Sequence, residues 1–200
     1  MSGQINRGSV FGEIIYEYAS NVKYKKFLEI GTWNGQGSTK CFIDGLLNRD
    51  DDYSFISIEA SRNFYEIACY HNSEFLSEKI KIFHGRITEI DELIHSDITG
   101  YKKQWLDDDI ANYNTCPNIF DEIKQQYDVV LLDGGEFSTF AEFTKLKDLT
   151  TILMLDDIKE LKNTAVVNSL NSDGEWKIII ESDDRNGFAV YEKLHSNKQV

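Results

Sequence analysis

Acidic residues close three of the strands that the sequence predicts, and a glycine-rich loop follows a fourth. Glu59 ends the apolar run SFISIE, Asp133 follows YDVVLL, and Asp156 and Asp157 follow TILML. Carboxylates that gather in one place usually hold a cation or share protons. The loop GTWNGQGS begins at Gly31, and glycines there let the backbone approach a ligand at the start of the next helix. These residue types predict a ligand site rich in acids.

The spacing of the glycines does not match the two common phosphate-binding loops. Gly31, Gly35 and Gly37 follow the order G-x-x-x-G-x-G instead of G-x-G-x-x-G, and the loop lacks the lysine of the G-K-S/T pattern. A tight strand-to-helix turn without a ligand is therefore one interpretation. Glu59 favours a ligand, because an acid at the end of the second strand of a nucleotide-binding α/β unit accepts hydrogen bonds from the ribose hydroxyls.

These residues need a scaffold, and the chain alternates short apolar runs with amphipathic stretches. That alternation predicts an α/β fold, with a mostly parallel sheet covered by helices on both faces. Ligands of such sheets bind at the carboxyl ends of the strands. WKIIIES and FAVYEKL are expected to pair as a terminal antiparallel hairpin. The other predicted strands are 26–30, 54–59, 80–84, 127–132 and 151–155, and the predicted helices are 10–20, 37–48, 62–70, 138–146 and 159–170.

Composition limits the class of protein and its partners. A chain of 200 residues suits a single globular domain. Its net charge of −13, without a basic stripe, argues against nucleic acid and against an anionic membrane surface. The apolar runs are too short to span a membrane, and the first ten residues lack the apolar core of a signal peptide, so we expect a cytoplasmic protein. The three cysteines are far apart and show no zinc-site spacing.

Four segments together resemble the class I S-adenosylmethionine-dependent methyltransferases. They are E-I-G-T-x-x-G-x-S, the acid that ends the second strand, D-V-V-L-L-D-G and L-M-L-D-D. The resemblance covers residues 26–194 and is nearest to the small-molecule O-methyltransferase branch. It implies one Rossmann-like domain over residues 1–200, with a doubly wound, seven-stranded sheet whose last strand is antiparallel. Residues 86–126 are expected to form a helical insertion that walls the acceptor pocket.

The resemblance also implies which residues bind the cofactor, S-adenosyl-L-methionine. Residues of the loop and its flanks would surround the amino-acid end of the cofactor: Glu29, Gly31, Thr32, Gly35 and Ser38. Trp33 lies inside the same loop and would border the cofactor.

At the nucleoside end, Glu59 would hold the ribose and Ala60 would flank the adenine. The turn Gly85-Arg86 would contact the adenine edge. Many relatives have an acid in that turn to accept a hydrogen bond from the adenine amino group. This chain has Arg86 there, which leaves the adenine contact open.

Asp133, Asp156 and Asp157 are expected over one rim of the sheet, where two interpretations compete. Metal-dependent relatives use an Asp after the fourth strand and an Asp-Asn pair after the fifth to hold Mg²⁺ or a similar ion, which lowers the pKa of the acceptor hydroxyl. This chain departs from that pattern with Asp-Asp. Metal-free relatives carry the same acids, which contact the cofactor ammonium or cap a helix.

Methyl transfer to a hydroxyl group without a metal needs a general base. The predicted catalytic residues are Asp133, Asp156 and Lys159, where Lys159 follows the acid pair and would act as a base or orient the substrate. A solvated lysine is the simpler interpretation of Lys159. His84 ends the third strand and is interpreted as a packed histidine, with a role as base as the alternative.

The predicted function is methyl transfer from S-adenosylmethionine to a hydroxyl group of a small molecule. D-G-G-E after the fourth strand is not the D/N-P-P-Y/F/W loop of the methyltransferases that act on DNA bases. A nicotinamide-dependent oxidoreductase predicts G-x-G-x-x-G and a catalytic Tyr-Lys pair, and neither is found. A non-catalytic module that binds the cofactor without turnover is the second interpretation.

Overall fold

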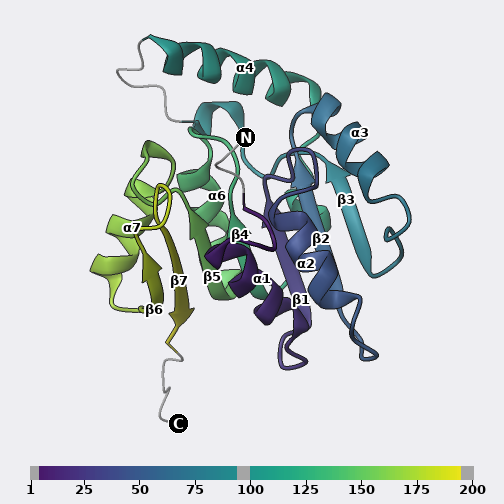
Figure 1. Ribbon diagram of the computed structural model, residues 1–200. Coiled ribbons are helices and arrows are strands. Elements are labelled where there is room, and N and C mark those ends of the chain that lie inside the picture. The colour runs from purple at the N-terminus through teal and green to yellow at the C-terminus, as the bar shows by residue number, and fades with distance from the viewer. Residues whose placement is uncertain (1–4, 94–99, 195–200) are drawn as a thin grey trace.

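A twisted sheet with helices on both faces forms the centre of the computed structural model, which describes residues 5–93 and 100–194 (Figure 1). Within the described residues the sheet has seven strands, in the order β3-β2-β1-β4-β5-β7-β6. The strands are β1 (Lys26–Ile30), β2 (Ser54–Glu59), β3 (Ile80–His84), β4 (Tyr127–Leu132), β5 (Thr150–Asp156), β6 (Trp176–Ser182) and β7 (Phe188–Lys193). The longer helices are α1 (Val10–Ser20), α2 (Ser38–Leu46), α3 (Arg62–His71), α4 (Tyr101–Thr115), α6 (Thr139–Leu146) and α7 (Leu161–Asp173).

The strand pairing confirms the predicted fold class. Strands β1 to β5 pair in parallel, and β7 pairs antiparallel with both β5 and β6. The chain moves outward from β1 through β2 to β3 and then returns to pair β4 with the other side of β1. The strand order therefore reverses between β1 and β4, which is where ligands of open α/β sheets bind.

Neighbouring residues of each central strand enter opposite hydrophobic cores, because side chains alternate across a strand. Phe27 and Val129 pack with residues of α1 and α2 on one face. Leu28 and Val130 pack with residues of α6 and α7 on the other. Both faces are thus buried, and this explains why β4 contains the continuous apolar run VVLL.

Helix α7 begins two residues later than predicted. The backbone N–H groups of Ile158 and Lys159 donate hydrogen bonds to the carbonyls of Gly187 and Asn186, at 3.1 Å each. These bonds tie the segment after β5 to the β6–β7 turn. Since the turn holds residues 158 and 159 in a non-helical conformation, α7 runs from Leu161 to Asp173.

The segment between β3 and β4 lies over the carboxyl ends of the strands. Helix α4 crosses this edge at the top of Figure 1, and Leu106 and Tyr113 of α4 form a small hydrophobic cluster with Phe137. The other helical pieces of the expected insertion that the structure describes are short: the 3₁₀ helix η1 (Ile90–Glu92) and α5 (Phe120–Ile123). Residues 94–99 of the expected helical insertion, within the stretch DELIHSDI, lie outside the described residues.

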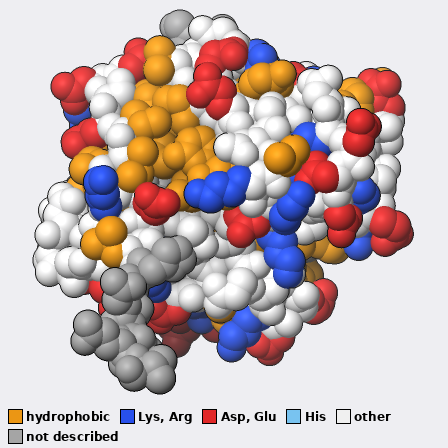
Figure 2. Space-filling model, turned by 90° about the horizontal axis from the view of Figure 1, so that it is seen from below, with side chains coloured by type: hydrophobic (Ala, Val, Ile, Leu, Met, Phe, Trp, Pro, Cys, Tyr) orange, Lys and Arg blue, Asp and Glu red, His pale blue; other side chains and the backbone are white. Residues whose placement is uncertain are grey.

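Seen from below, acidic and basic side chains are interspersed around one hydrophobic patch (Figure 2). A second 3₁₀ helix, η2 (Lys147–Leu149), connects α6 to β5. Across the described part of the chain, every helix is too short or too polar to cross a lipid bilayer.

Candidate active site

The glycine-rich loop leaves β1 in a conformation that requires glycine. Gly31 has a φ of +98°, and a Cβ atom there would lie 2.3 Å from the carbonyl oxygen of Asp133 on the neighbouring strand. The N–H group of Gly31 donates a 3.0 Å hydrogen bond to the carbonyl of Ile58 at the end of β2. The loop is therefore fixed between the ends of β2 and β4.

A buried polar network lies beneath this loop. The Glu29 side chain is 0% exposed, and its Oε2 atom accepts hydrogen bonds from Thr39 Oγ1 at 2.6 Å and Ser57 Oγ at 2.5 Å. Thr32 Oγ1 joins the network through Ser57 Oγ. Burial raises the pKa of Glu29 to about 7. Glu29, Thr32 and Ser38 are buried here and support the loop from below.

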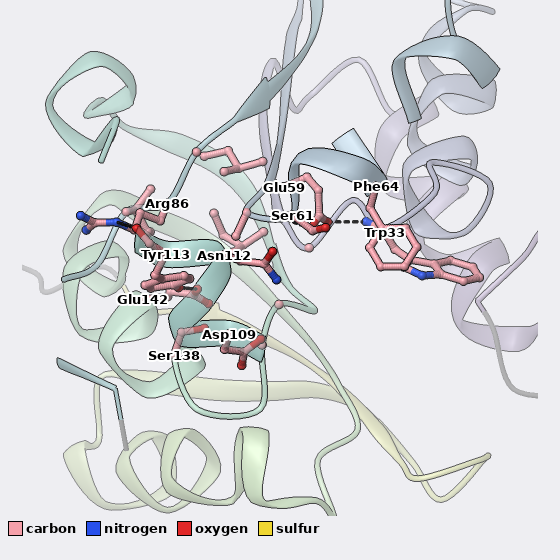
Figure 3. Close-up of a pocket in the computed structure, with 18 of the residues that line it drawn as sticks. Trp33, Glu59, Ser61, Phe64, Arg86, Asp109, Asn112, Tyr113, Ser138 and Glu142 are labelled. Carbon is pink, nitrogen blue, oxygen red and sulfur yellow. Dashed lines mark hydrogen bonds between the residues drawn. The ribbon is translucent and has the colours of Figure 1, made fainter. Parts of the chain in front are cut away.

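Glu59 holds the loop from the end of β2. Its Oε2 atom accepts a 2.7 Å hydrogen bond from the backbone N–H of Trp33, and its Oε1 atom accepts one of 2.8 Å from the N–H of Ser61 (Figure 3). Burial raises the pKa of Glu59 to about 7 despite these bonds. Each carboxylate oxygen keeps a second acceptor site for a ligand hydroxyl.

These elements border a cavity of about 360 Å³. Gly31, Trp33, Glu59, Ala60, Gly85, Arg86 and Asp133 line it, so the structure brings together most of the predicted cofactor residues. Glu29, Thr32, Gly35 and Ser38 lie outside its lining. In the part of the chain that the structure describes, the loop therefore meets the cavity through Gly31 and Trp33.

Arg86 lines the cavity, but its guanidinium group bonds to the protein. Its Nη1 atom donates to the carbonyl of Thr88 and to Glu89 Oε2, the latter at 2.7 Å. Its Nε atom donates to the carbonyl of Tyr113 at 3.3 Å. Arg86 thus connects the turn after β3 to the end of α4 and stabilises this part of the fold.

The far wall of the cavity contains residues that the sequence analysis missed. They come from α4 and from the segment after β4, and Figure 3 shows them opposite Glu59 and Trp33: Asp109, Asn112, Tyr113, Ser138 and Glu142. The only sequence signal was an acidic run in α4, and nothing in it pointed to Glu142. These residues meet only because α4 crosses the sheet edge.

Two acids of this wall have pKa values near neutral pH. Burial raises the pKa of Glu142 to about 7 and that of Asp109 to about 6. Glu142 Oε1 accepts a 3.4 Å hydrogen bond from the Tyr113 hydroxyl, and its buried Oε2 atom has no partner among the described residues. Groups with such pKa values in a cavity are candidates for proton transfer.

The acids after β4 and β5 converge as the sequence predicted. Carboxylate oxygens of Asp133, Asp156 and Asp157 lie within 4.8 Å of one another. The sequence analysis did not predict the cation among them: Lys162 Nζ lies 2.7 Å from Asp133 Oδ1 and 3.2 Å from Asp157 Oδ2. Burial lowers the pKa of the Lys162 ammonium, but these two carboxylates outweigh burial and keep the pKa above its ordinary value.

The two candidate bases from the sequence lie elsewhere. Lys159 is half-exposed and forms an ion pair of 2.8 Å with Asp183, away from the cavity lining. His84 packs beside the Tyr65 ring, with 5.6 Å between ring centroids, and is also outside the lining. In the described structure, Asp109 and Glu142 are better placed than either residue to accept a proton in the cavity.

Comparisons with known proteins agree on the fold. No protein-family model and no curated protein sequence matches the chain. Among solved structures, an O-methyltransferase from Bacillus cereus in complex with S-adenosylhomocysteine has a TM-score of 0.66 at 13% identity, over 96% of this chain and 84% of that one. The chain has the class I methyltransferase fold.

Two further structures give this fold similar support. A putative caffeoyl-CoA O-methyltransferase from Staphylococcus aureus has a TM-score of 0.64 at 14% identity and covers 92% of this chain and 83% of its own. TomG from Streptomyces achromogenes, an O-methyltransferase in complex with S-adenosylmethionine, has a TM-score of 0.62 at 16% identity, over 92% of this chain and 79% of its own. The cavity of this chain lies at the carboxyl ends of β1 and β4, where the strand order of the fold reverses.

Proposed function

We propose that this protein is an S-adenosylmethionine-dependent methyltransferase that methylates a hydroxyl group of a small molecule. The observation that carries this proposal is the bond between Glu59 and the glycine-rich loop at the edge of the cavity. This bond sets the Glu59 carboxylate beside the loop, which supports a site where Glu59 would hold the ribose diol and the loop would bind the amino-acid end of the cofactor. The fold is one in which known members bind such a nucleoside.

The charges of the cavity fit this cofactor. Four acids line it, Glu59, Asp109, Asp133 and Glu142, and the guanidinium of Arg86 is already bonded to backbone carbonyls and Glu89. S-adenosylmethionine carries a sulfonium and an ammonium group, which an acidic cavity attracts. Among the described residues that line the cavity, Arg86 is the one cation and it is already bonded, so the cavity disfavours the pyrophosphate of a nicotinamide dinucleotide.

When bound, the cofactor would supply an electrophilic methyl group, whose bond to sulfur breaks so that S-adenosylhomocysteine leaves. This chain must then take the proton of the acceptor hydroxyl as its oxygen bonds to the methyl carbon. Asp109 and Glu142 are the residues we assign to this task, because each is a cavity carboxylate with a pKa near neutrality. We assign no step to Lys159, whose ammonium pairs with Asp183. No divalent cation enters this scheme.

The acceptor is proposed to bind between Asp133 and the wall formed by α4. Asn112, Tyr113 and Ser138 offer polar groups to a hydroxylated molecule there. A hydroxyl acceptor also agrees with the O-methyltransferases of the same fold described above. Their sequence identity of 13–16% indicates the fold and not a particular substrate.

Calorimetric titration with S-adenosylhomocysteine tests the proposal first. We expect micromolar binding, followed by transfer of labelled methyl groups to at least one member of a panel of phenols, catechols and sugars. Binding without transfer to any acceptor would favour a non-catalytic module of the same fold. The absence of binding would remove the methyltransferase proposal altogether.

A further inference from the structure

The carboxylate cluster formed by Asp133, Asp156 and Asp157 is occupied by cationic groups of the protein itself. Lys162 Nζ contacts Asp133 and Asp157 at 2.7 and 3.2 Å. Arg185 Nη2 lies 3.3 Å from Asp156 Oδ2. Each of the three acids therefore faces a protein cation.

The position of Lys162 in its helix shows that the acids hold it there. Lys162 is the second residue of α7, where the positive end of the helix dipole disfavours a cation. Its side chain is only 8% exposed, and a buried ammonium group is costly unless it is paired. The favourable partners in the structure are the carboxylates of Asp133 and Asp157.

A further donor completes the cluster. Asn186 Nδ2 donates a 3.1 Å hydrogen bond to Asp157 Oδ1, so that both oxygens of Asp157 have protein partners. A magnesium ion needs nearly octahedral oxygen ligands at about 2.0–2.1 Å and would have to take these oxygens from Lys162 and Asn186. The residues of this site therefore do not fit a divalent metal.

We propose that the Lys162 ammonium is the resident cation of this cluster and stands in place of a divalent metal ion. Asp133 lines the cavity, whereas Lys162 lies behind it in contact with Asp133. Lys162 is thus a positioning residue that fixes the Asp133 carboxylate. This inference concerns metal occupancy and does not require that the proposed methyl transfer occurs.

Titration with Mn²⁺, followed by electron paramagnetic resonance of the free ion, tests the inference on the protein without cofactor. The wild-type protein should leave millimolar Mn²⁺ free. Lys162→Ala uncovers the carboxylates of Asp133 and Asp157 and should bind Mn²⁺, with a melting temperature that rises as Mn²⁺ is added. Lys159→Ala is the matched control, because it removes an exposed lysine three residues away, and it should behave as the wild type does.

Two outcomes would overturn the inference. One is tight Mn²⁺ binding by the wild-type protein that Asp157→Asn abolishes, and this arm does not depend on whether Lys162→Ala folds. The other is a folded Lys162→Ala variant that does not bind Mn²⁺. The carboxylates would then have no affinity for a divalent ion, and Lys162 could not be said to stand in its place. Binding of S-adenosylhomocysteine is measured separately, so failure of the proposed function would be distinguishable.

Discussion

The Glu59 carboxylate accepts a 2.7 Å hydrogen bond from the backbone N–H of Trp33, and this bond joins the end of β2 to the glycine-rich loop after β1. Trp33 has a φ of +48°, which is unusual for a residue with a side chain. The bond to Glu59 helps hold that conformation. The proposed ribose-binding group and the proposed amino-acid-binding loop are therefore parts of one structure.

Glu59→Ala should weaken S-adenosylhomocysteine binding. The variant removes a buried carboxylate that supports the loop through Trp33 and would accept hydrogen bonds from the ribose, and losses of this kind cost about 1–3 kcal/mol. Calorimetry should therefore show an affinity lower by roughly 5- to 150-fold. Glu66→Ala is the control, because Glu66 pairs with Arg62 on the exposed surface of α3. Equal affinities for the wild type and Glu59→Ala would remove Glu59 from the cofactor site.

Local patterns in the sequence were sufficient to predict the sheet. The apolar runs of β1 and β4 are bounded by charged or glycine-rich turns, and the predicted and observed bounds agree for both strands, 26–30 and 127–132. The acids after β4 and β5 were predicted to converge because parallel strands end at one edge. Each of these inferences depends only on strand period and strand direction.

The remaining parts of the site depend on contacts between distant segments. Lys159 was chosen from its place after the acid pair, but bonds from residues 158 and 159 to the β6–β7 turn delay α7 and bring Lys162 to the acids instead. Asp109 and Glu142 reach one cavity because α4 crosses the sheet edge. No spacing rule within either segment predicts such an arrangement.

The rate of methyl transfer should rise with pH through the pKa of the acid that serves as base. A base works only when it is deprotonated, so half of the rise is expected near pH 6 if the base is Asp109 and near pH 7 if it is Glu142. Asp109→Asn or Glu142→Gln, whichever removes the base, should lower turnover by about 10²- to 10⁴-fold and abolish this rise.

Asp107→Asn is the matched control for this pair, because Asp107 lies on α4 two residues before Asp109 but is exposed and pairs with Lys103. It should keep the wild-type turnover and pH profile. Full activity in both Asp109→Asn and Glu142→Gln would exclude these acids as the base and would require another proton acceptor in the cavity.

Arg86→Ala should destabilise the protein. The variant removes donors to the carbonyls of Thr88 and Tyr113 and the ion pair with Glu89, so the free energy of unfolding should fall by about 1–3 kcal/mol. Chemical denaturation measures this fall, and hydrogen exchange should show weaker protection in α4.

Arg62→Ala serves as the comparison for Arg86, since the Arg62–Glu66 pair is exposed and should contribute little to the free energy of unfolding. If Arg86→Ala instead keeps the stability of the wild type and binds S-adenosylhomocysteine more weakly, the role of Arg86 would be contact with the adenine and not support of α4.

Glu29→Gln should become more stable relative to the wild type as pH rises. The pKa of Glu29 is about 7 in the folded protein, above its ordinary value of 4.5, because the side chain is buried. Between these two values the folded state keeps a proton that the unfolded state has released. The wild type therefore loses stability as pH rises from about 4.5 to about 7, by up to about 3 kcal/mol.

A glutamine cannot ionise, yet its carbonyl oxygen can still accept hydrogen bonds from Thr39 and Ser57. The difference in unfolding free energy between Glu29→Gln and the wild type, measured by urea denaturation from pH 5 to pH 8, should therefore grow with pH. Using the difference cancels the contributions of the other buried acids. Glu66→Gln, at an exposed position, should show no such trend, and a flat difference for Glu29→Gln would mean that Glu29 is already ionised at pH 5.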